Sequence, residues 1–125
     1  MKKLTLTFLV TLALMSCSVQ NQVSTKTPAE LNVMTFNIRL STDSDKENSW
    51  NNRKTDALAL MEYYHPDIMG VQEAVPEQMI DIKNGLKNYD FVGVGRDDGA
   101  NKGEYSAIFY DKNKLEVLKS GTFWL

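Results

Sequence analysis

The chain has 125 residues, of which 42% are hydrophobic and 24% charged, with a formal net charge of −2. This composition is typical of one ordinary globular domain, and it excludes a disordered chain and a protein embedded in a membrane along its whole length. Binding to a nucleic-acid backbone draws heavily on Lys and Arg, so the acidic balance argues against a protein whose main task is to grip nucleic acid.

The first residues carry the features of an export signal. Lys2 and Lys3 give a positive start, and residues 4–14 form an apolar run broken only by threonines. Such a run is too short to cross a bilayer permanently, but it suits the core of a signal peptide. We therefore expect residues 1–16 to be a signal peptide.

The apolar run ends in Leu14-Met15-Ser16-Cys17, and Cys17 is the only cysteine. This ending resembles a bacterial lipobox, in which the cysteine is lipidated and becomes the new N-terminus. The alternative is a simple signal peptide with an incidental cysteine, although a lone thiol has no disulfide partner in an oxidising compartment. Residues 17–30 are polar and aperiodic, which predicts a flexible tether. We expect a lipid-anchored protein of the cell envelope, held outside the cytoplasm in the periplasm or at the cell surface.

The folded part begins with a predicted strand and helix. Residues 31–38 alternate partly and are rich in β-forming side chains, which predicts a strand. Residues 41–49 are a polar loop dense in Asp, Asn and Ser. A helix over residues 50–64 follows, with Ser49 as its N-cap and Pro66 as its stop. The side chains expected on its inward face are Ala57, Leu58, Met61 and Tyr64.

A second strand and helix follow in the same order. The apolar run of residues 68–72 suits a strand that is covered on both faces. Pro76 opens a helix that reaches about residue 86, because proline is favoured in the first helical turn. The side chains expected to face inward are Met79, Ile82, Leu86 and, through its stem, Lys83.

The remaining residues predict strands joined by polar turns. Residues 89–94 are a strand, and residues 95–103 form a glycine-rich loop. Two more strands, over residues 105–110 and 115–119, flank a turn at residues 111–114. The element order predicts an α/β fold of the α+β type, with a mixed β-sheet and helices on one face. A layered sheet needs both faces covered, so the domain is expected to be cut short.

Four segments in a fixed order carry the chemically suggestive residues: residues 35–39 (TFNIR), 66–73 (PDIMGVQE), 93–99 (GVGRDDG) and 103–110 (GEYSAIFY). With this order and spacing the chain resembles the endonuclease/exonuclease/phosphatase superfamily, whose members are similar to deoxyribonuclease I. The closing SGTFWL fits bacterial members. The resemblance implies that residues 31–125 are the N-terminal half of a four-layer α/β sandwich, from a truncated reading frame or a trimmed chain. It also implies a phosphoester hydrolase dependent on Mg²⁺ or Mn²⁺.

Glu73 is the strongest candidate for the metal-binding residue. It is predicted to sit just after a buried strand, where a carboxylate emerges at the open end of the sheet, and Mg²⁺ prefers one or two carboxylates with waters and a substrate phosphate. The resemblance assigns the Gln-Glu motif this ligand role. The alternative is a solvated acid that favours the N-terminus of the helix opened by Pro76.

Asn37 and Arg39 follow the first predicted strand. In similar proteins the Asn of the T-F-N motif lies in the active site, which makes Asn37 a candidate catalytic and metal-site residue; the alternative is a turn-forming Asn that satisfies local backbone. Arg39 is expected either to bind the phosphate or to face solvent. Trp50 and Arg53 also recur in similar bacterial proteins, and here they are expected only to fix the start of the helix against the sheet.

The other candidates lie in the second half of the chain. Glu104 resembles an acid that positions a catalytic His in relatives, and Arg96 is expected either to bind phosphate or to remain a solvated loop residue. The superfamily's G-D-F-N and S-D-H motifs, which carry catalytic Asp, Asn and His, do not occur in this chain. The sole histidine, His65, is at the wrong place to substitute and is expected to be structural.

The expected function is metal-dependent hydrolysis of a phosphate mono- or diester, with little turnover by this chain alone. Nucleases of this type often place a basic residue shortly after the Gln-Glu pair, whereas Ala74, Val75 and Pro76 follow here. This weakens nucleic acid as a partner and leaves phosphorylated small molecules or phospholipid head groups, acted on by a monomer. The alternative function is a non-enzymatic surface lipoprotein that binds a glycan or a phosphorylated ligand.

Overall fold

The computed structural model describes residues 30–124. The predicted signal peptide, Cys17 and all but the last residue of the predicted tether lie outside the described residues. Within residues 30–124, no helix has the length and apolar character needed to cross a membrane.

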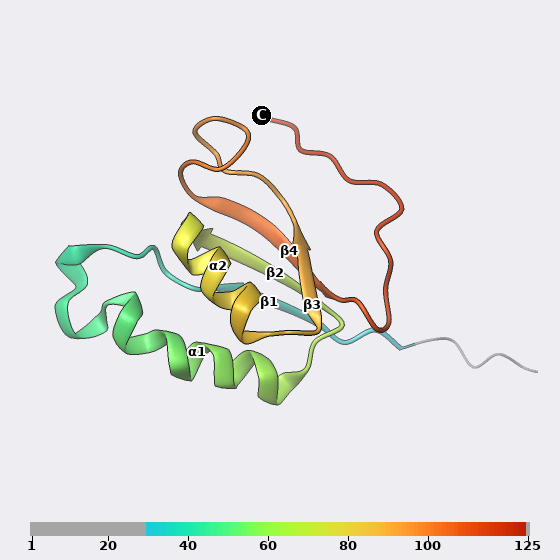
Figure 1. Ribbon diagram of the computed structural model, residues 1–125, viewed down its shortest axis with the longest axis horizontal. Coiled ribbons are helices and arrows are strands. Elements are labelled where there is room, and N and C mark those ends of the chain that lie inside the picture. Colours follow the sequence, from blue (N-terminus) through green and yellow to red (C-terminus); the bar gives the residue numbers. More distant parts are fainter. Residues whose placement is uncertain (1–29, 125) are drawn as a thin grey trace, which may run out of the picture.

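A single four-stranded sheet organises the described residues (Figure 1). Its strands are β1 (Val33–Asn37), β2 (Ile68–Ala74), β3 (Tyr89–Val92) and β4 (Tyr105–Asp111), arranged in the order β1-β2-β4-β3. β1 runs parallel to β2, and β4 is antiparallel to both β2 and β3. The sheet is therefore mixed, which confirms the predicted fold class.

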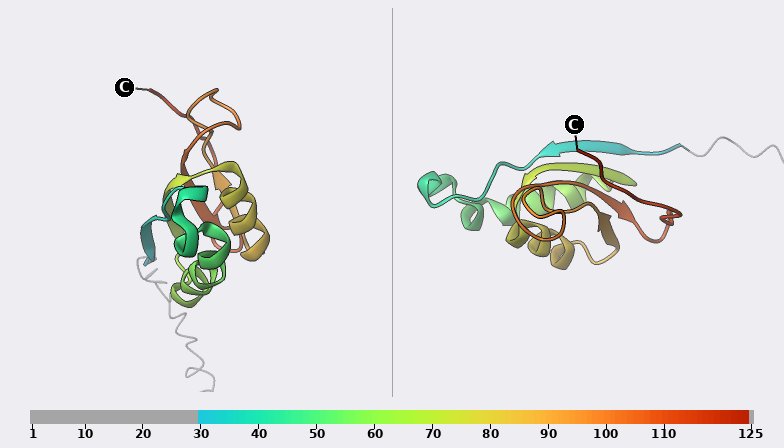
Figure 2. Two further views of the ribbon diagram at one scale, coloured as in Figure 1. Left: turned by 90° about the vertical axis from the view of Figure 1, so that its left-hand side faces the viewer. Right: turned by 90° about the horizontal axis from the view of Figure 1, so that it is seen from above.

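Two helices, α1 (Trp50–Tyr64) and α2 (Pro76–Gly85), lie on one face of this sheet (Figures 1 and 2). Side chains alternate along β4, so that Tyr105, Ala107 and Phe109 are buried while Ser106 and Ile108 are exposed. The same alternation buries the inward side of β2 against the helices. The hydrophobic core thus occupies the space between the helices and one sheet face, as the sequence predicts.

The bounds of α1 agree with the prediction, but its inward face differs at one residue. Met61 is completely buried, whereas Tyr64 is 54% exposed. The helix ends at Tyr64. The Tyr64 ring packs edge-on against the Tyr63 ring, with 5.1 Å between the ring centroids, instead of entering the core. Ser49 occupies the N-cap position, but its side chain forms no capping hydrogen bond.

The inward side chains of α2 are mostly as expected. Met79, Ile82 and Leu86 are buried. Lys83 stays exposed, lies over the ring of Phe91 and forms an ion pair with an Asp90 carboxylate oxygen at 2.8 Å. Its stem therefore covers the edge of the core while its ammonium group remains in solvent.

Three segments differ from the predicted elements. The polar loop contains a 3₁₀ helix, η1 (Asp43–Asn48), and the strand predicted over residues 89–94 ends at Val92, because Gly93 has a φ of 138°. The strand predicted over residues 115–119 is wrong: the turn at residues 112–114 is present, but no strand follows it up to residue 124. Both edges of β4 are already paired, one with β2 and the other with β3, so no edge of β4 is free for a further strand. Residues 115–119 instead lie across the helix-free face and line a cavity with Ile108.

Candidate active site

A β-bulge in β2 places the carboxylate of Glu73. The pairing of β2 with β4 shifts register between Val71 and Ala74, so two residues lie between paired positions. Glu73 lies in this irregular segment and has a φ of 62°, the left-handed region that non-glycine residues rarely adopt. The prediction that Glu73 follows the strand is therefore wrong in detail. The strand continues to Ala74, and a bulge inside it redirects the side chain.

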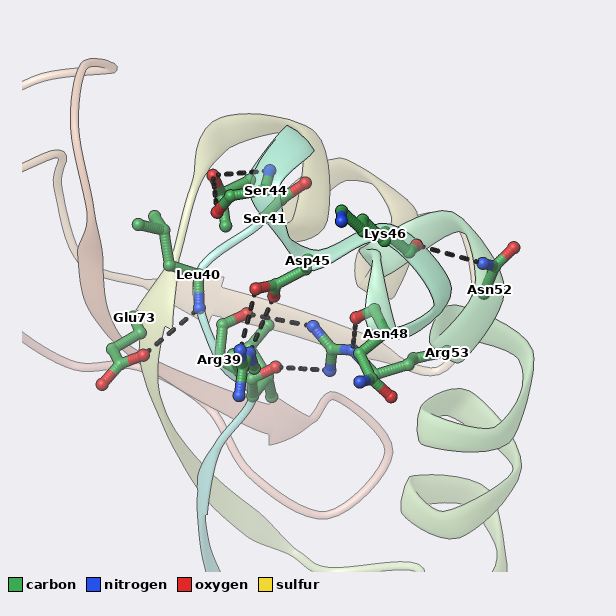
Figure 3. Close-up of polar contacts among 12 residues, drawn as sticks. Arg39, Leu40, Ser41, Ser44, Asp45, Lys46, Asn48, Asn52, Arg53 and Glu73 are labelled. Atoms are coloured by element: carbon green, nitrogen blue, oxygen red, sulfur yellow. Dashed lines mark hydrogen bonds and ion pairs between the residues drawn. The ribbon is translucent and has the colours of Figure 1, made fainter.

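Both oxygens of the Glu73 carboxylate accept a hydrogen bond. Oε1 accepts from Nδ2 of Asn37 at 2.8 Å. Oε2 accepts from the backbone N–H of Leu40 at 3.2 Å (Figure 3). The hydrogen bonds from Asn37 and Leu40, together with the positive charge of Arg39, hold the pKa of Glu73 below its ordinary value. The group is therefore a carboxylate at neutral pH, and each oxygen keeps a further lone pair.

Asn37 connects the end of β1 to this carboxylate. Its Oδ1 accepts a hydrogen bond from the backbone N–H of Arg39 at 3.0 Å, while its Nδ2 donates to Glu73. The parallel pairing of β1 and β2 sets Asn37 beside Gln72, one residue before Glu73. The structure thus brings together Asn37 and Glu73, which lie 36 residues apart in the sequence.

Arg39 lies next to this pair, but its guanidinium group already has an acidic partner. Its Nε and Nη2 donate to the two carboxylate oxygens of Asp45 at 2.7 and 2.8 Å (Figure 3). The Arg39 side chain is 62% exposed, whereas that of Asp45 is 6% exposed, and the hydrogen bonds from Arg39 hold the pKa of Asp45 low. This pair uses two of the five guanidinium N–H groups, and a phosphate would have to bind through the others.

The segment between β1 and η1 is held from two sides. Arg53 on α1 donates to the carbonyl oxygen of Ile38 at 2.9 Å, to that of Asn48 at 2.6 Å and to that of Arg39 at 3.4 Å (Figure 3). On the other side, the buried Gln78 of α2 bonds to the backbone of Arg39 and of Ser41. Arg53 therefore fixes the segment beside the site as well as the start of the helix.

Arg96 and Glu104 form a separate pair at the same end of the sheet. Their closest atoms, Nη1 and Oε2, are 3.4 Å apart, and Arg96 also lies 3.6 Å from a carboxylate oxygen of Asp97. With Thr122 and Trp124 they line a cavity of about 130 Å³. Within residues 30–124, no hydrogen bond or ion pair joins this pair to Glu73 or Asn37.

The remaining residues singled out in the sequence have structural environments. His65 is exposed, adopts a left-handed φ of 44° and caps α1 through its backbone N–H, which bonds to the carbonyl of Met61. It precedes β2, whereas Glu73 lies near the other end of that strand. Trp50 is buried and donates from Nε1 to an Asp81 carboxylate oxygen at 2.8 Å.

The sequence interpretation missed Gln78 and Asp45. Gln78 has a detectable signal, since a Gln three residues after an N-cap position commonly bonds back to the N-cap backbone. Here its Oε1 accepts from the backbone N–H of Val75 at 3.0 Å. Asp45 carries no signal of its own, because it is one acid in a segment rich in acids and its pairing depends on the left-handed backbone of Arg39.

The residues present fit one part of a divalent metal site. Mg²⁺ is commonly held by one or two carboxylates, with waters and substrate oxygens completing the shell. Glu73 offers one ionised carboxylate with unused lone pairs. In the described part of the chain, no cluster of three or more His, Cys, Asp or Glu side chains has the geometry of a complete metal site. Among the described residues, Glu73 is therefore the candidate acidic ligand at this position, with Asn37 beside it.

Comparisons with known proteins identify the fold. No family model matches the chain, and no curated protein matches it by sequence search. A solved structure of an endonuclease/exonuclease/phosphatase from Bacteroides vulgatus is 45% identical, with a TM-score of 0.74 over 75% of this chain and 36% of that one. Two structures from Bacteroides thetaiotaomicron are each 39% identical. One is a mannosyl-6-phosphatase (TM-score 0.71; 74% of this chain, 35% of that one), and the other is an endonuclease/exonuclease/phosphatase family protein (0.73; 76% and 35%).

These matches cover about three quarters of this chain, and the chain spans about a third of the length of each of these structures. The identity and the matching fold agree with the family resemblance found in the sequence. The chain is therefore similar, over about three quarters of its length, to part of the domain of endonuclease/exonuclease/phosphatase family proteins.

Proposed function

We propose that this chain supplies the carboxylate side of the active site of a phosphoester hydrolase that uses Mg²⁺ or Mn²⁺. The observation that carries the proposal is the environment of Glu73. Its carboxylate lies in a β-bulge with a strained backbone, accepts one hydrogen bond at each oxygen and has a lowered pKa. Strained backbone conformations cluster at functional sites, where the surrounding structure over-determines them.

In this proposal Glu73 holds the cation, and Asn37 fixes the rotation of the carboxylate through its Nδ2. A bound cation would supply charge stabilisation to the phosphoryl oxygens and the leaving group. Arg39 adds positive charge beside the carboxylate and keeps N–H groups that do not face Asp45, which suits a contact with a phosphoryl oxygen. The base that activates water comes from outside this chain's residues, because the family's S-D-H motif does not occur in it.

Glu104 and Arg96 are proposed for a secondary role at the same end of the sheet. Their ion pair at 3.4 Å lies beside a cavity that Thr122 and Trp124 also line. This position suits a contact with the non-reacting part of a substrate more than with the scissile phosphate. Glu104 would then hold Arg96 in place, and Arg96 would meet a polar or anionic group.

The proposed substrate is a phosphomonoester of a sugar. One of the similar structures is a mannosyl-6-phosphatase, and the acidic balance of this chain disfavours a nucleic-acid backbone. The Gln-Glu pair is followed by Ala74, Val75 and Pro76. No basic side chain therefore stands at the position where nucleases of this type often place one. Phospholipid head groups and nucleotides are the comparison substrates for the test.

A chimera tests the proposal in the context of a complete domain. Residues 31–124 of this chain would replace the matching third of the Bacteroides thetaiotaomicron mannosyl-6-phosphatase, and release of phosphate from mannose 6-phosphate would be measured with Mg²⁺. We expect hydrolysis that falls at least about 100-fold in Glu73→Ala, from loss of a charge-stabilising ligand, and that is unchanged in Glu116→Ala, an exposed acid outside the site. A folded chimera that binds the sugar phosphate without hydrolysing it would favour the non-enzymatic binding role instead.

We further propose that the protein is anchored by a lipid on Cys17 and acts outside the cytoplasm. The support is the sequence alone, namely the basic start, the apolar run and the Leu14-Met15-Ser16-Cys17 ending. Expression in a bacterium fed with a radiolabelled fatty acid would test this. Label on the full chain that disappears in Cys17→Ser, but persists in Ser18→Ala, is the expected result, and equal label in both variants would contradict it.

A further inference from the structure

A fully buried amide lies behind the candidate site and is not part of it. Gln78, in the first turn of α2, has no exposed surface. Its Oε1 accepts hydrogen bonds from the backbone N–H of Ser41 at 3.1 Å and of Val75 at 3.0 Å, and its Nε2 donates to the carbonyl oxygen of Arg39 at 2.9 Å. One side chain therefore bonds to two backbone segments that are far apart in the sequence.

Two hydrogen bonds of Gln78 flank the Leu40 backbone N–H, the group that contacts Glu73. The N–H of Leu40 donates to Oε2 of Glu73, and Leu40 lies between the two residues that Gln78 holds, Arg39 and Ser41. On the other side, the bond to Val75 fixes the chain two residues after Glu73. Gln78 thus positions two things at once. It holds the backbone that follows Glu73, and it holds the Leu40 N–H, which is one of the two hydrogen-bond donors to the Glu73 carboxylate.

A helix-capping role explains only one of these bonds. Capping of α2 requires the contact with Val75 at its N-terminus. It does not require the two contacts with the segment after β1, which hold Arg39 in its left-handed conformation at φ 63°. A buried amide is costly unless it is hydrogen-bonded, so the position of Gln78 and the path of that segment depend on each other.

We propose that Gln78 is a positioning residue, which holds the Leu40 N–H against Glu73 and so fixes the carboxylate for cation binding. The expected effect on Mg²⁺ binding rests on the proposed metal-dependent function, whereas the positioning of the Leu40 N–H by Gln78 does not. Groups that orient a metal ligand typically contribute about 10- to 100-fold to metal affinity. Gln78 touches neither cation nor substrate in this scheme and acts only through residues 39–41 and Val75.

The test compares two variants of the full 125-residue chain. Gln78→Met keeps the side-chain length and removes all three hydrogen bonds. The matched control is Ile82→Ala, which removes a completely buried side chain from the next turn of α2 and has no hydrogen bond to the segment after β1. Both would be measured where each is more than about 95% folded by its unfolding curve. The readouts are hydrogen exchange of the Leu40 amide and the dissociation constant for Mg²⁺ alone.

We expect Gln78→Met to speed exchange at Leu40 and to weaken Mg²⁺ binding at least about 10-fold, while Ile82→Ala leaves both near the wild-type values. Unchanged exchange and binding in Gln78→Met would overturn the inference. Equal losses in both variants would also overturn it, because they would reflect general destabilisation. If the wild type binds no Mg²⁺ but Leu40 exchange rises only in Gln78→Met, the positioning of Leu40 is supported and the proposed metal-dependent function fails.

Discussion

The left-handed backbone of Glu73 makes an unusual prediction about glycine and alanine at this position. Both Glu73→Gly and Glu73→Ala remove the carboxylate and its hydrogen bonds to Asn37 and Leu40. They differ in whether a Cβ remains at a φ of 62°. The stability difference between the two variants therefore isolates the strain that the bulge imposes on its residue.

Two opposing free energies set the size of this difference. An L-residue with a Cβ in the left-handed region costs about 1–2 kcal/mol, which glycine avoids. Glycine in a strand in turn loses roughly 0.5–1 kcal/mol relative to alanine through backbone entropy. We expect Glu73→Gly to be more stable than Glu73→Ala by about 0.5–1 kcal/mol, because the relief of strain outweighs the loss of backbone entropy.

Gln72 provides the matched control, since it precedes Glu73 in β2 and is not among the residues with positive φ. There the order should reverse, with Gln72→Gly less stable than Gln72→Ala by roughly 0.5–1 kcal/mol. Urea unfolding of the four variants, followed by circular dichroism at fixed pH and salt, measures both differences. If Glu73→Ala equals or exceeds Glu73→Gly in stability, the bulge does not strain Glu73 and the argument from strain to function fails.

Three further predictions concern the stability of the fold. Arg53→Met should lower the free energy of unfolding by about 1.5–3 kcal/mol, because the part-buried carbonyl of Ile38 loses a charged donor; a change below about 0.5 kcal/mol in urea unfolding would contradict this. Gly95→Ala should destabilise by about 1–3 kcal/mol in thermal unfolding, because a Cβ there would lie 2.3 Å from the carbonyl oxygen of Lys102, whereas Gly121→Ala meets nothing within 4 Å and should be neutral. Hydrogen bonds from Lys114, which has the larger effect, and from the Asn32 N–H hold the pKa of Asp67 below its ordinary value. The contribution of the Asp67 carboxylate to stability is therefore present above a pH of about 4 and is lost as the pH falls through the lowered pKa. Asp67→Asn should therefore flatten the acid side of the stability-versus-pH curve, and an unchanged slope would exclude this linkage.

The sequence predicted the elements whose patterns are local. The bounds of α1 follow from its helical spacing and from Pro66 beyond its end. The strand predicted over residues 115–119 was wrong, because alternation of apolar and polar residues indicates a strand only where a neighbouring strand has free backbone groups. β4 has partners on both sides, so the predicted hairpin of residues 115–119 with β4 has no free edge at which to form.

The site was predictable in its residue types and not in its geometry. The motif order identified Asn37 and Glu73, and the structure joins them by a hydrogen bond of 2.8 Å. The bulge at Glu73 carries no sequence signal, because Gln-Glu-Ala contains no glycine to indicate a left-handed residue. The pairing of Arg39 with Asp45 depends on the left-handed backbone of Arg39, which no residue type signals. The contacts of Gln78 with the segment after β1 join elements that are far apart in the sequence.

Titration of the full chain with Mg²⁺, followed by NMR of the Glu73 carboxylate carbon and of the Asn37 and Leu40 amides, tests the central claim most directly. Glu73→Gln is the informative variant, because its side-chain oxygen still accepts hydrogen bonds while the negative charge is removed. We predict saturable shifts at these three residues in the wild type that disappear in Glu73→Gln and persist in Glu116→Gln. Shifts that survive unchanged in Glu73→Gln, or that centre on Asp97 and Asp98 instead, would contradict a metal-binding role for this carboxylate.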